Sequence, residues 1–176
     1  MSDCSNTKAG SDGMGKRKPK KIYSDEQLFN EARYVHKDGW DGFQCSAIRN
    51  ACISACRLAS FKMTIAKLSI FCIADGQDER QPEFGLVRIY GKPELKVSMG
   101  RVSTGEPYPI VRPIYMPWSA KVKIRFDTDQ FNIEDISNLM TRVGIQVGVG
   151  EGRWDSKKTA GQGWGTFEVK EVTELN

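Results

Sequence analysis

Cations and an aromatic residue lie between two glycine clusters near the C-terminal end of the chain, a pattern that suits a polyanionic ligand. The segment 144–165, called here the glycine loop, contains Arg153, Trp154, Lys157 and Lys158. Glycine loses much conformational entropy on folding, so its density favours positive φ angles or close approach of a ligand. Cations bind phosphates, and an aromatic ring stacks on a base. The segment therefore predicts a nucleic-acid-binding loop.

A second group of cations follows one face of a predicted strand. In Trp118–Asp127, apolar residues alternate with Lys121, Lys123 and Arg125, so one face of the strand is core and the other is positively charged. Like charges along one face repel each other, and an acidic partner would relieve that repulsion. A solvated edge strand that resists aggregation explains the same pattern.

Two arginines accompany the most regular helical pattern in the chain. Apolar residues repeat every three or four positions through Cys45–Ala59, and they are mostly small, so this helix should pack closely on a sheet. Arg49 and Arg57 fall off this stripe. They are candidates for phosphate contacts, although arginines on a helix surface are commonly just solvated.

Two carboxylates lie in a turn-rich segment just before that helix. The segment Lys37–Phe43 contains Asp38 and Asp41, each followed by glycine. Two carboxylates in a loop can bind a metal or act as acid and base, but Asp-Gly is also ordinary turn chemistry. The chain has no GxxxxGK[ST] motif and only one histidine, so we expect no nucleotide triphosphatase and favour a non-catalytic protein without a cofactor or metal.

Composition bounds the other function classes. The chain has 176 residues, a net charge of +4 and 39% hydrophobic residues, which suits one folded domain over 22–176. Met1–Lys21 is polar and ends in KRKPKK, and it predicts a disordered basic arm. We expect a cytoplasmic protein without membrane spans. The five cysteines include no CxxC pair, which favours buried thiols over a zinc site.

The remaining periodicity predicts an α+β fold. Ser24 and Gln27 predict a capping box that opens a helix, and Asn132 predicts the cap of a second helix that Gly144 ends. The last strand, after the glycine loop, gives a split βαβ order of the ferredoxin-like kind. The other expected elements are a helix over Tyr23–Val35, strands over Lys67–Asp75, Gly85–Gly91 and Thr166–Val172, an irregular segment over Glu94–Pro113 with Arg101, Tyr108 and Arg112, and a helix from Asn132 to Val143.

Two segments together resemble the RAMP superfamily, the RNA-binding proteins that form the backbone of CRISPR effector complexes. Gly42–Arg57 is similar to the family's loop-to-helix segment, with Ser46 and Arg49 at the helix start. The C-terminal helix followed by GVGEGR and GQGWGTFEV is similar to the family's glycine-rich loop and final strand. A compact virus- or plasmid-encoded relative would fit the short chain.

The resemblance implies a ferredoxin-like (RRM-like) palm with insertions that binds single-stranded RNA, or DNA, along a groove. It also implies copies stacked head to tail, and in some members a loop aspartate that cleaves RNA with a divalent metal, for which Asp38 and Asp41 are the candidates. The alternatives are that metal-dependent ribonuclease and a phage- or plasmid-encoded assembly or inhibitor protein without nucleic acid. The residues expected to contact nucleic acid are Arg49, Arg57, Lys121, Lys123, Arg125, Arg153, Trp154, Lys157 and Lys158.

Overall fold

The computed structural model describes residues 23–101, 105–156 and 161–175, and it has the predicted α+β architecture, in which the sheets are antiparallel. The predicted basic arm, Met1–Lys21, lies outside the described residues. None of the helices in the described ranges is long and apolar enough to cross a bilayer. The elements are α1 (Asp25–Ala32), β1 (Tyr34–Val35), β2 (Asp41–Gln44), α2 (Cys45–Ala55), the 3₁₀ turn η1 (Cys56–Leu58), α3 (Met63–Ser69), β3 (Ile70–Ile73), β4 (Gly76–Gln77), β5 (Gly85–Tyr90), β6 (Pro93–Arg101), β7 (Pro107–Tyr115), β8 (Ser119–Ala120), β9 (Lys123–Phe126), α4 (Ile133–Arg142) and the π-helical turn η2 (Val143–Val147).

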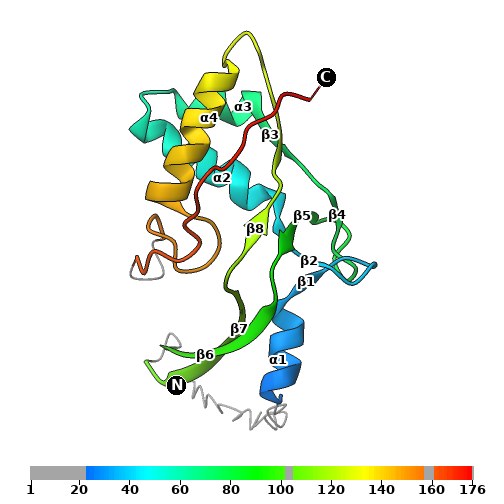
Figure 1. Ribbon diagram of the computed structural model, residues 1–176. Coiled ribbons are helices and arrows are strands. Elements are labelled where there is room, and N and C mark those ends of the chain that lie inside the picture. Colours follow the sequence, from blue (N-terminus) through cyan, green and yellow to red (C-terminus); the bar gives the residue numbers. More distant parts are fainter. Residues whose placement is uncertain (1–22, 102–104, 157–160, 176) are drawn as a thin grey trace, which may run out of the picture.

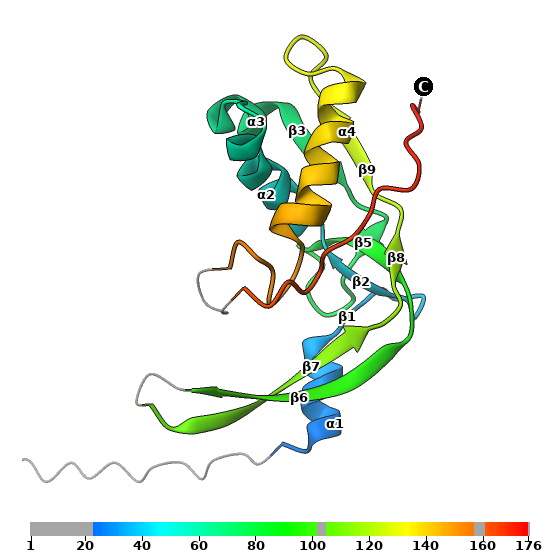
Figure 2. The same ribbon diagram turned by 60° about the vertical axis from the view of Figure 1, so that its left-hand side comes forward.

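Within the described residues every strand pairing is antiparallel, and the strands form three sets. The first has the order β1-β2-β5-β4, with β8 also paired to β5, and the other two are the pairs β3–β9 and β6–β7. The backbone N–H of Asp75, just beyond β3, donates to the carbonyl of Leu86 on β5 (2.8 Å), so the first two sets adjoin. The β6–β7 hairpin extends away from α2, α3 and α4 (Figures 1 and 2).

The main core lies where α2 meets β3, β9, α4 and η2. The predicted small-residue stripe is confirmed, because Ala51, Cys52, Ala55 and Cys56 are all buried. Small side chains let α2 approach its neighbours closely, as the 3.7 Å contact between the sulfurs of Cys52 and Met140 shows. Burial raises the pKa of the Cys52 thiol to about 12, so this cysteine acts as a small hydrophobe.

The predicted capping box at Ser24 and the predicted cap at Asn132 are both present, and the Asn132 cap is also a capping box. Ser24 Oγ accepts from the Gln27 N–H (3.2 Å), and Asn132 Oδ1 accepts from the Asp135 N–H (2.8 Å). In turn, the side-chain oxygens of Gln27 and Asp135 accept from the backbone N–H groups of Ser24 and Asn132. These reciprocal bonds satisfy N–H groups at the helix start that have no partner within the helix.

Two predicted strands have different bounds in the structure. Lys67–Ser69 is helical and ends α3, because Ala66 and Ser69 are buried at helical spacing before the strand β3 begins. The predicted strand Trp118–Asp127 is divided, since β8 pairs with β5 whereas β9 pairs with β3. The segment Glu94–Pro113, predicted to be irregular, instead forms most of a regular hairpin with nine residues in each strand.

The predictions for the C-terminal part of the chain, from Gly144 to Val172, are wrong in two respects. Gly144 does not end a helix but lies inside η2, where a Cβ would be 2.1 Å from the Phe167 carbonyl oxygen. Thr166–Val172 has no strand assignment. It runs alongside the glycine loop, and the Phe167 N–H donates to the Gly144 carbonyl (3.1 Å) while its ring packs on the core.

A pair of glycine substitutions tests a second close approach, that of Gly165 to the backbone of Val149. A Cβ at Gly165 would be 1.7 Å from the Val149 carbonyl oxygen, whereas a Cβ at Gly150 meets no atom within 4 Å. Both residues have positive φ angles, 69° and 80°. We expect Gly150→Ala to lower the free energy of unfolding by about 1–2 kcal/mol, the cost of left-handed backbone, and Gly165→Ala to lower it by clearly more. Equal losses in urea titrations of the two variants would contradict the packing described here.

Candidate nucleic-acid interface

An open groove of about 870 Å³ lies between the β6–β7 hairpin, the glycine loop and the β1–β2 edge of the first sheet. Its size is in the range of ligand-binding clefts, which typically have a few polar groups on an apolar lining. Among the described residues, four cations and three carboxylates contribute to the lining, so this part of the groove carries little excess charge. The lining cations are Arg33, Arg80, Lys96 and Arg112, the lining carboxylates are Glu31, Asp78 and Glu151, and the aromatic residues are Tyr34, Phe43, Tyr115, Trp118 and Trp164.

One cation–π contact joins the hairpin to the glycine loop. The Lys96 ammonium, on β6, lies 3.5 Å from the centre of the Trp164 ring in the glycine loop. The Trp164 side chain is partly exposed. An ammonium in this position is attracted by the electron density of the ring face, and a nucleobase could occupy the same face by stacking.

A second contact across the groove is an ion pair. Arg112 Nε, on β7, donates to Glu151 Oε2 in the glycine loop (3.1 Å). Both side chains are about half exposed, and exposed ion pairs contribute only about 0–1 kcal/mol. The hairpin is therefore connected to the glycine loop by contacts that separate at little cost.

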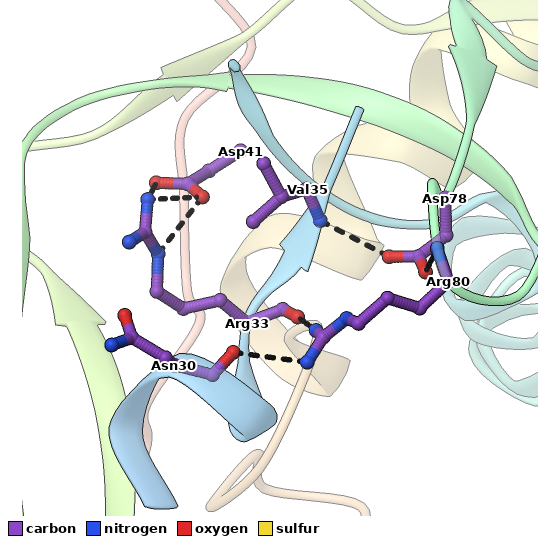
Figure 3. Close-up of polar contacts among 6 residues, drawn as sticks. All are labelled: Asn30, Arg33, Val35, Asp41, Asp78 and Arg80. Atoms are coloured by element: carbon purple, nitrogen blue, oxygen red, sulfur yellow. Dashed lines mark hydrogen bonds and ion pairs between the residues drawn. The ribbon is translucent and has the colours of Figure 1, made fainter. Parts of the chain in front are cut away.

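The hairpin-side end of the groove rests on a buried ion pair (Figure 3). Arg33 donates to both carboxylate oxygens of Asp41, at 2.8–3.0 Å, and Asp41 is only 7% exposed. Burial, together with the negative charge of Asp41, raises the pKa of Tyr115 to about 12, so this phenol stays protonated. The pair connects the C-terminal end of α1 to β2.

A second buried carboxylate organises the adjoining loop. Asp78, 2% exposed, accepts from the backbone N–H groups of Val35 (3.0 Å), Arg80 (2.9 Å) and Gln81 (2.9 Å). The Arg80 guanidinium donates to the carbonyl oxygens of Asn30 and Arg33 at the end of α1 (Figure 3). These bonds satisfy helix carbonyls that have no partner within α1. Asp78 and Arg80 are therefore structural groups at the margin of the groove.

Most glycines of the glycine loop serve contacts within the loop. A Cβ at Gly152 would be 2.4 Å from the Trp164 ring, and one at Gly163 would be 2.5 Å from the Trp154 ring. Two backbone hydrogen bonds join the first part of the loop to its last part. The Val149 N–H donates to the Gly165 carbonyl (2.9 Å), and the Trp164 N–H donates to the Gly152 carbonyl (3.2 Å). Close approach of chain to chain thus explains these glycines, while Gly150, with open space around it, lines the groove.

Two of the predicted cations, Arg153 in the glycine loop and Arg57 beside it, have partners inside the protein. Arg57 donates to Asp155 Oδ1 (2.8 Å), and Arg153 donates to the Gly150 carbonyl (3.0 Å). Burial raises the pKa of Asp155, but bonds from Arg57 and Ser54 and the charges of Arg57 and Arg153 outweigh it, so the pKa lies below its ordinary value. Trp154 is 53% exposed. Lys157 and Lys158 lie outside the described residues.

The predicted cations of β9 lie on a different surface. Ile124 and Phe126 face the core while Lys123 and Arg125 are exposed, which confirms the predicted alternation within β9, and Lys121 is exposed just before it. Lys123 pairs with Asp75 (3.0 Å). Arg49 and Arg125 both approach the ring of Phe71. The structure therefore separates the predicted contacts into a β9 group and a glycine-loop group.

The two candidate aspartates have different environments. Asp41 has both oxygens occupied by Arg33, as described above. Asp38 is 68% exposed and lies 3.3 Å from His36 Nδ1. Among the described residues, no group of three or more His, Cys, Asp or Glu side chains is arranged to hold a metal ion.

The chain matches no protein-family model, no curated protein and no solved structure.

The sequence analysis missed most of the residues that line the groove, Lys96 among them, although it named Arg112. The polar side of the β6–β7 hairpin places Lys96 opposite Arg112, and the period-two alternation of Leu95, Val97 and Met99 was the signal for it. Trp164 was part of the glycine-loop motif, yet its position beneath Lys96 depends on a contact between distant segments.

The aspartates provide a matched test of the buried ion pair. We expect Asp41→Asn to lower the free energy of unfolding by about 3 kcal/mol, because it leaves the partly buried Arg33 without its counter-charge. We expect Asp38→Asn to change it by less than about 0.5 kcal/mol, since that side chain is exposed. Chemical denaturation of both variants measures the difference. An Asp41→Asn protein as stable as the wild type would show that the pair has no structural role.

Proposed function

We propose that this protein binds single-stranded nucleic acid, RNA or DNA, in the groove between the hairpin and the glycine loop. The observation that carries the proposal is the Lys96 ammonium 3.5 Å above the partly exposed Trp164 ring. A base that stacks on Trp164 displaces Lys96, and the released ammonium is then beside the phosphate of the same nucleotide. Aromatic stacking with a cation nearby is how strands are bound with little dependence on sequence.

Several groups near Trp164 support this proposal. Arg112 is bound to Glu151 only by an exposed ion pair, so a phosphate can replace the carboxylate at little cost. The groove also contains the open backbone at Gly150 and the rings of Tyr115 and Trp118. Arg153, Trp154, Lys157 and Lys158, which follow Gly150 in the chain, would extend the contacts beyond the groove.

We also propose a ferredoxin-like palm of the RAMP kind. The order β2–α2 and β9–α4, with β3 antiparallel to β9, supports it. In this proposal the extended segment that contains Phe167 takes the place of the last strand, and the β6–β7 hairpin is an insertion.

We propose further that copies of the protein assemble along the bound strand. Leu95, Val97 and Met99 lie on one face of β6 and are 42%, 49% and 68% exposed, which leaves an apolar surface for a neighbouring copy. A ribonuclease is less well supported, because Arg33 occupies Asp41 and no group of three or more His, Cys, Asp or Glu side chains within the described residues is arranged to hold a metal ion.

Substitution of the two stacked residues tests binding in the groove. We expect Trp164→Ala to weaken binding of single-stranded RNA about 5- to 100-fold, which is the loss of affinity when one base can no longer stack on an aromatic ring. Trp164→Phe should weaken binding much less, because a ring remains. Lys96→Gln should reduce the slope of log affinity against log salt by about one. Fluorescence anisotropy across a salt series, with single-stranded RNA and DNA, measures both.

Lys92→Gln, an exposed lysine on the turn before β6, is the matched control and should leave affinity and slope near those of the wild type. Binding that ignores salt, or no binding at low salt, contradicts the proposed function. A protein that assembles without binding nucleic acid would instead favour the assembly or inhibitor alternative.

The apolar face of β6 gives a prediction of its own. Val97→Ser with Met99→Ser should reduce the mass of the particles formed on a long RNA, because these side chains no longer bury apolar surface between copies. Light scattering after size-exclusion chromatography measures that mass, with Glu94→Ser on the same strand as the control. Unchanged particles would show that copies do not assemble through this face.

A further inference from the structure

An exposed aromatic ring lies between two arginines on the sheet surface opposite the main core. Phe71 on β3 is 37% exposed, whereas its neighbour Cys72 packs on the core. The guanidinium carbons of Arg49 and Arg125 lie 5.9 Å and 5.6 Å from the centre of the Phe71 ring. Arg125 is the direct cross-strand partner of Phe71, and Arg49 reaches the ring from α2.

One of these arginines is held in place. Arg49 donates to the carbonyl oxygens of Ile70 (3.2 Å) and Lys67, at the junction of α3 and β3. A guanidinium that is already ordered loses little conformational entropy when a ligand binds to it. The position beside Phe71 is therefore organised before any ligand arrives.

The charge of this surface is positive. Arg49, Lys123 and Arg125 contribute three cations, and Asp75, which binds Lys123 at 3.0 Å, contributes one carboxylate. Like charges on adjacent positions repel each other, and a polyanion removes that repulsion. The surface thus favours an anionic ligand.

A second cation–aromatic cluster adjoins the first through Asp75. The other Asp75 oxygen accepts from the Arg88 N–H on β5 (3.1 Å). The Arg88 guanidinium carbon lies 5.0 Å from the Tyr90 ring centre and 5.7 Å from that of Trp40. The repetition of arginine beside an aromatic ring on neighbouring strands matches a ligand that repeats a flat group and a negative charge.

We infer that this surface, formed by Arg49, Phe71, Lys123, Arg125 and the adjoining Arg88 cluster, is a second stacking site for single-stranded nucleic acid. None of these residues belongs to the lining of the groove. Guanidinium planes and aromatic rings stack on bases while the same guanidinium groups bind phosphates, whereas an acidic peptide supplies charge without the stacking face. The inference rests on the proposed function for its ligand class but not on the groove.

Photo-cross-linking of an RNA that contains 5-iodouridine tests the inference, with the cross-linked peptides identified by mass spectrometry. We expect cross-links at Phe71 or Tyr90 in addition to those at Trp164. Lys123→Gln with Arg125→Gln should remove the Phe71 cross-link, keep the Trp164 cross-link and weaken affinity about 5- to 100-fold. Lys37→Gln with Lys92→Gln is the charge-matched control, and thermal unfolding confirms that each variant is folded.

Each outcome separates this inference from the proposed function. Cross-links confined to the groove, with unchanged affinity in the Lys123/Arg125 variant, overturn the second site and leave the proposed function intact. Cross-links at Phe71 that persist in Trp164→Ala support the second site even if the groove does not bind. Displacement of the RNA from this surface by polyglutamate at equal charge concentration would assign it to an acidic protein partner and overturn the inference.

Discussion

The structure depends on the close crossing of two glycine-containing segments, where Gly165 lies against the backbone of Val149. A Cβ at Gly165 would overlap the Val149 carbonyl oxygen, and the bond from the Val149 N–H to the Gly165 carbonyl fixes the crossing. Trp164 therefore lies beneath Lys96, and Phe167 reaches the core. The ring that we assign to base stacking is placed by backbone contacts, so its position does not depend on flexible side chains.

A separate polar network positions the opposite wall of the groove. The Arg33–Asp41 pair and the bonds made by Asp78 and Arg80 join α1, β1 and the loop after β4, and α1 packs on β7 of the hairpin. The carboxylates of Asp41 and Asp78 are buried, so leaving either one without its partners is costly. The hairpin is thus held by α1, while its contacts with the glycine loop are weak and exposed.

Local patterns in the sequence predicted the local structure well. The capping residues Ser24 and Asn132, the small-residue stripe of α2 and the alternation in β9 each depend on residues near in sequence, so their periods were sufficient. The start of β3 was predicted incorrectly, because Ala66 and Ser69 are buried at helical spacing before it. The role of Gly144 and the C-terminal strand were predicted incorrectly, because Gly144 and Phe167 are determined by a contact between segments that no local pattern contains.

The candidate site was harder to predict for a related reason. Sequence indicates which side chains are cationic, but the partners of Arg57 and Lys123 are carboxylates that only the fold brings near. The glycines were correctly identified as positions of close approach, yet the group that approaches most of them is the chain itself. Trp164 and Lys96 form the candidate site because β6 and the glycine loop, far apart in the sequence, come together.

The division of one predicted strand into β8 and β9 has a mechanical consequence. Trp118 lines the groove just before β8, and Lys123 and Arg125 lie on β9 only a few residues later, so a short covalent path connects the two surfaces. Because β8 is bonded to β5 and β9 to β3, neither half can rotate alone without breaking sheet hydrogen bonds. A nucleic-acid strand bound to both surfaces would be bent by the protein at a fixed angle, which is set by the twist between the pairs β5–β8 and β3–β9.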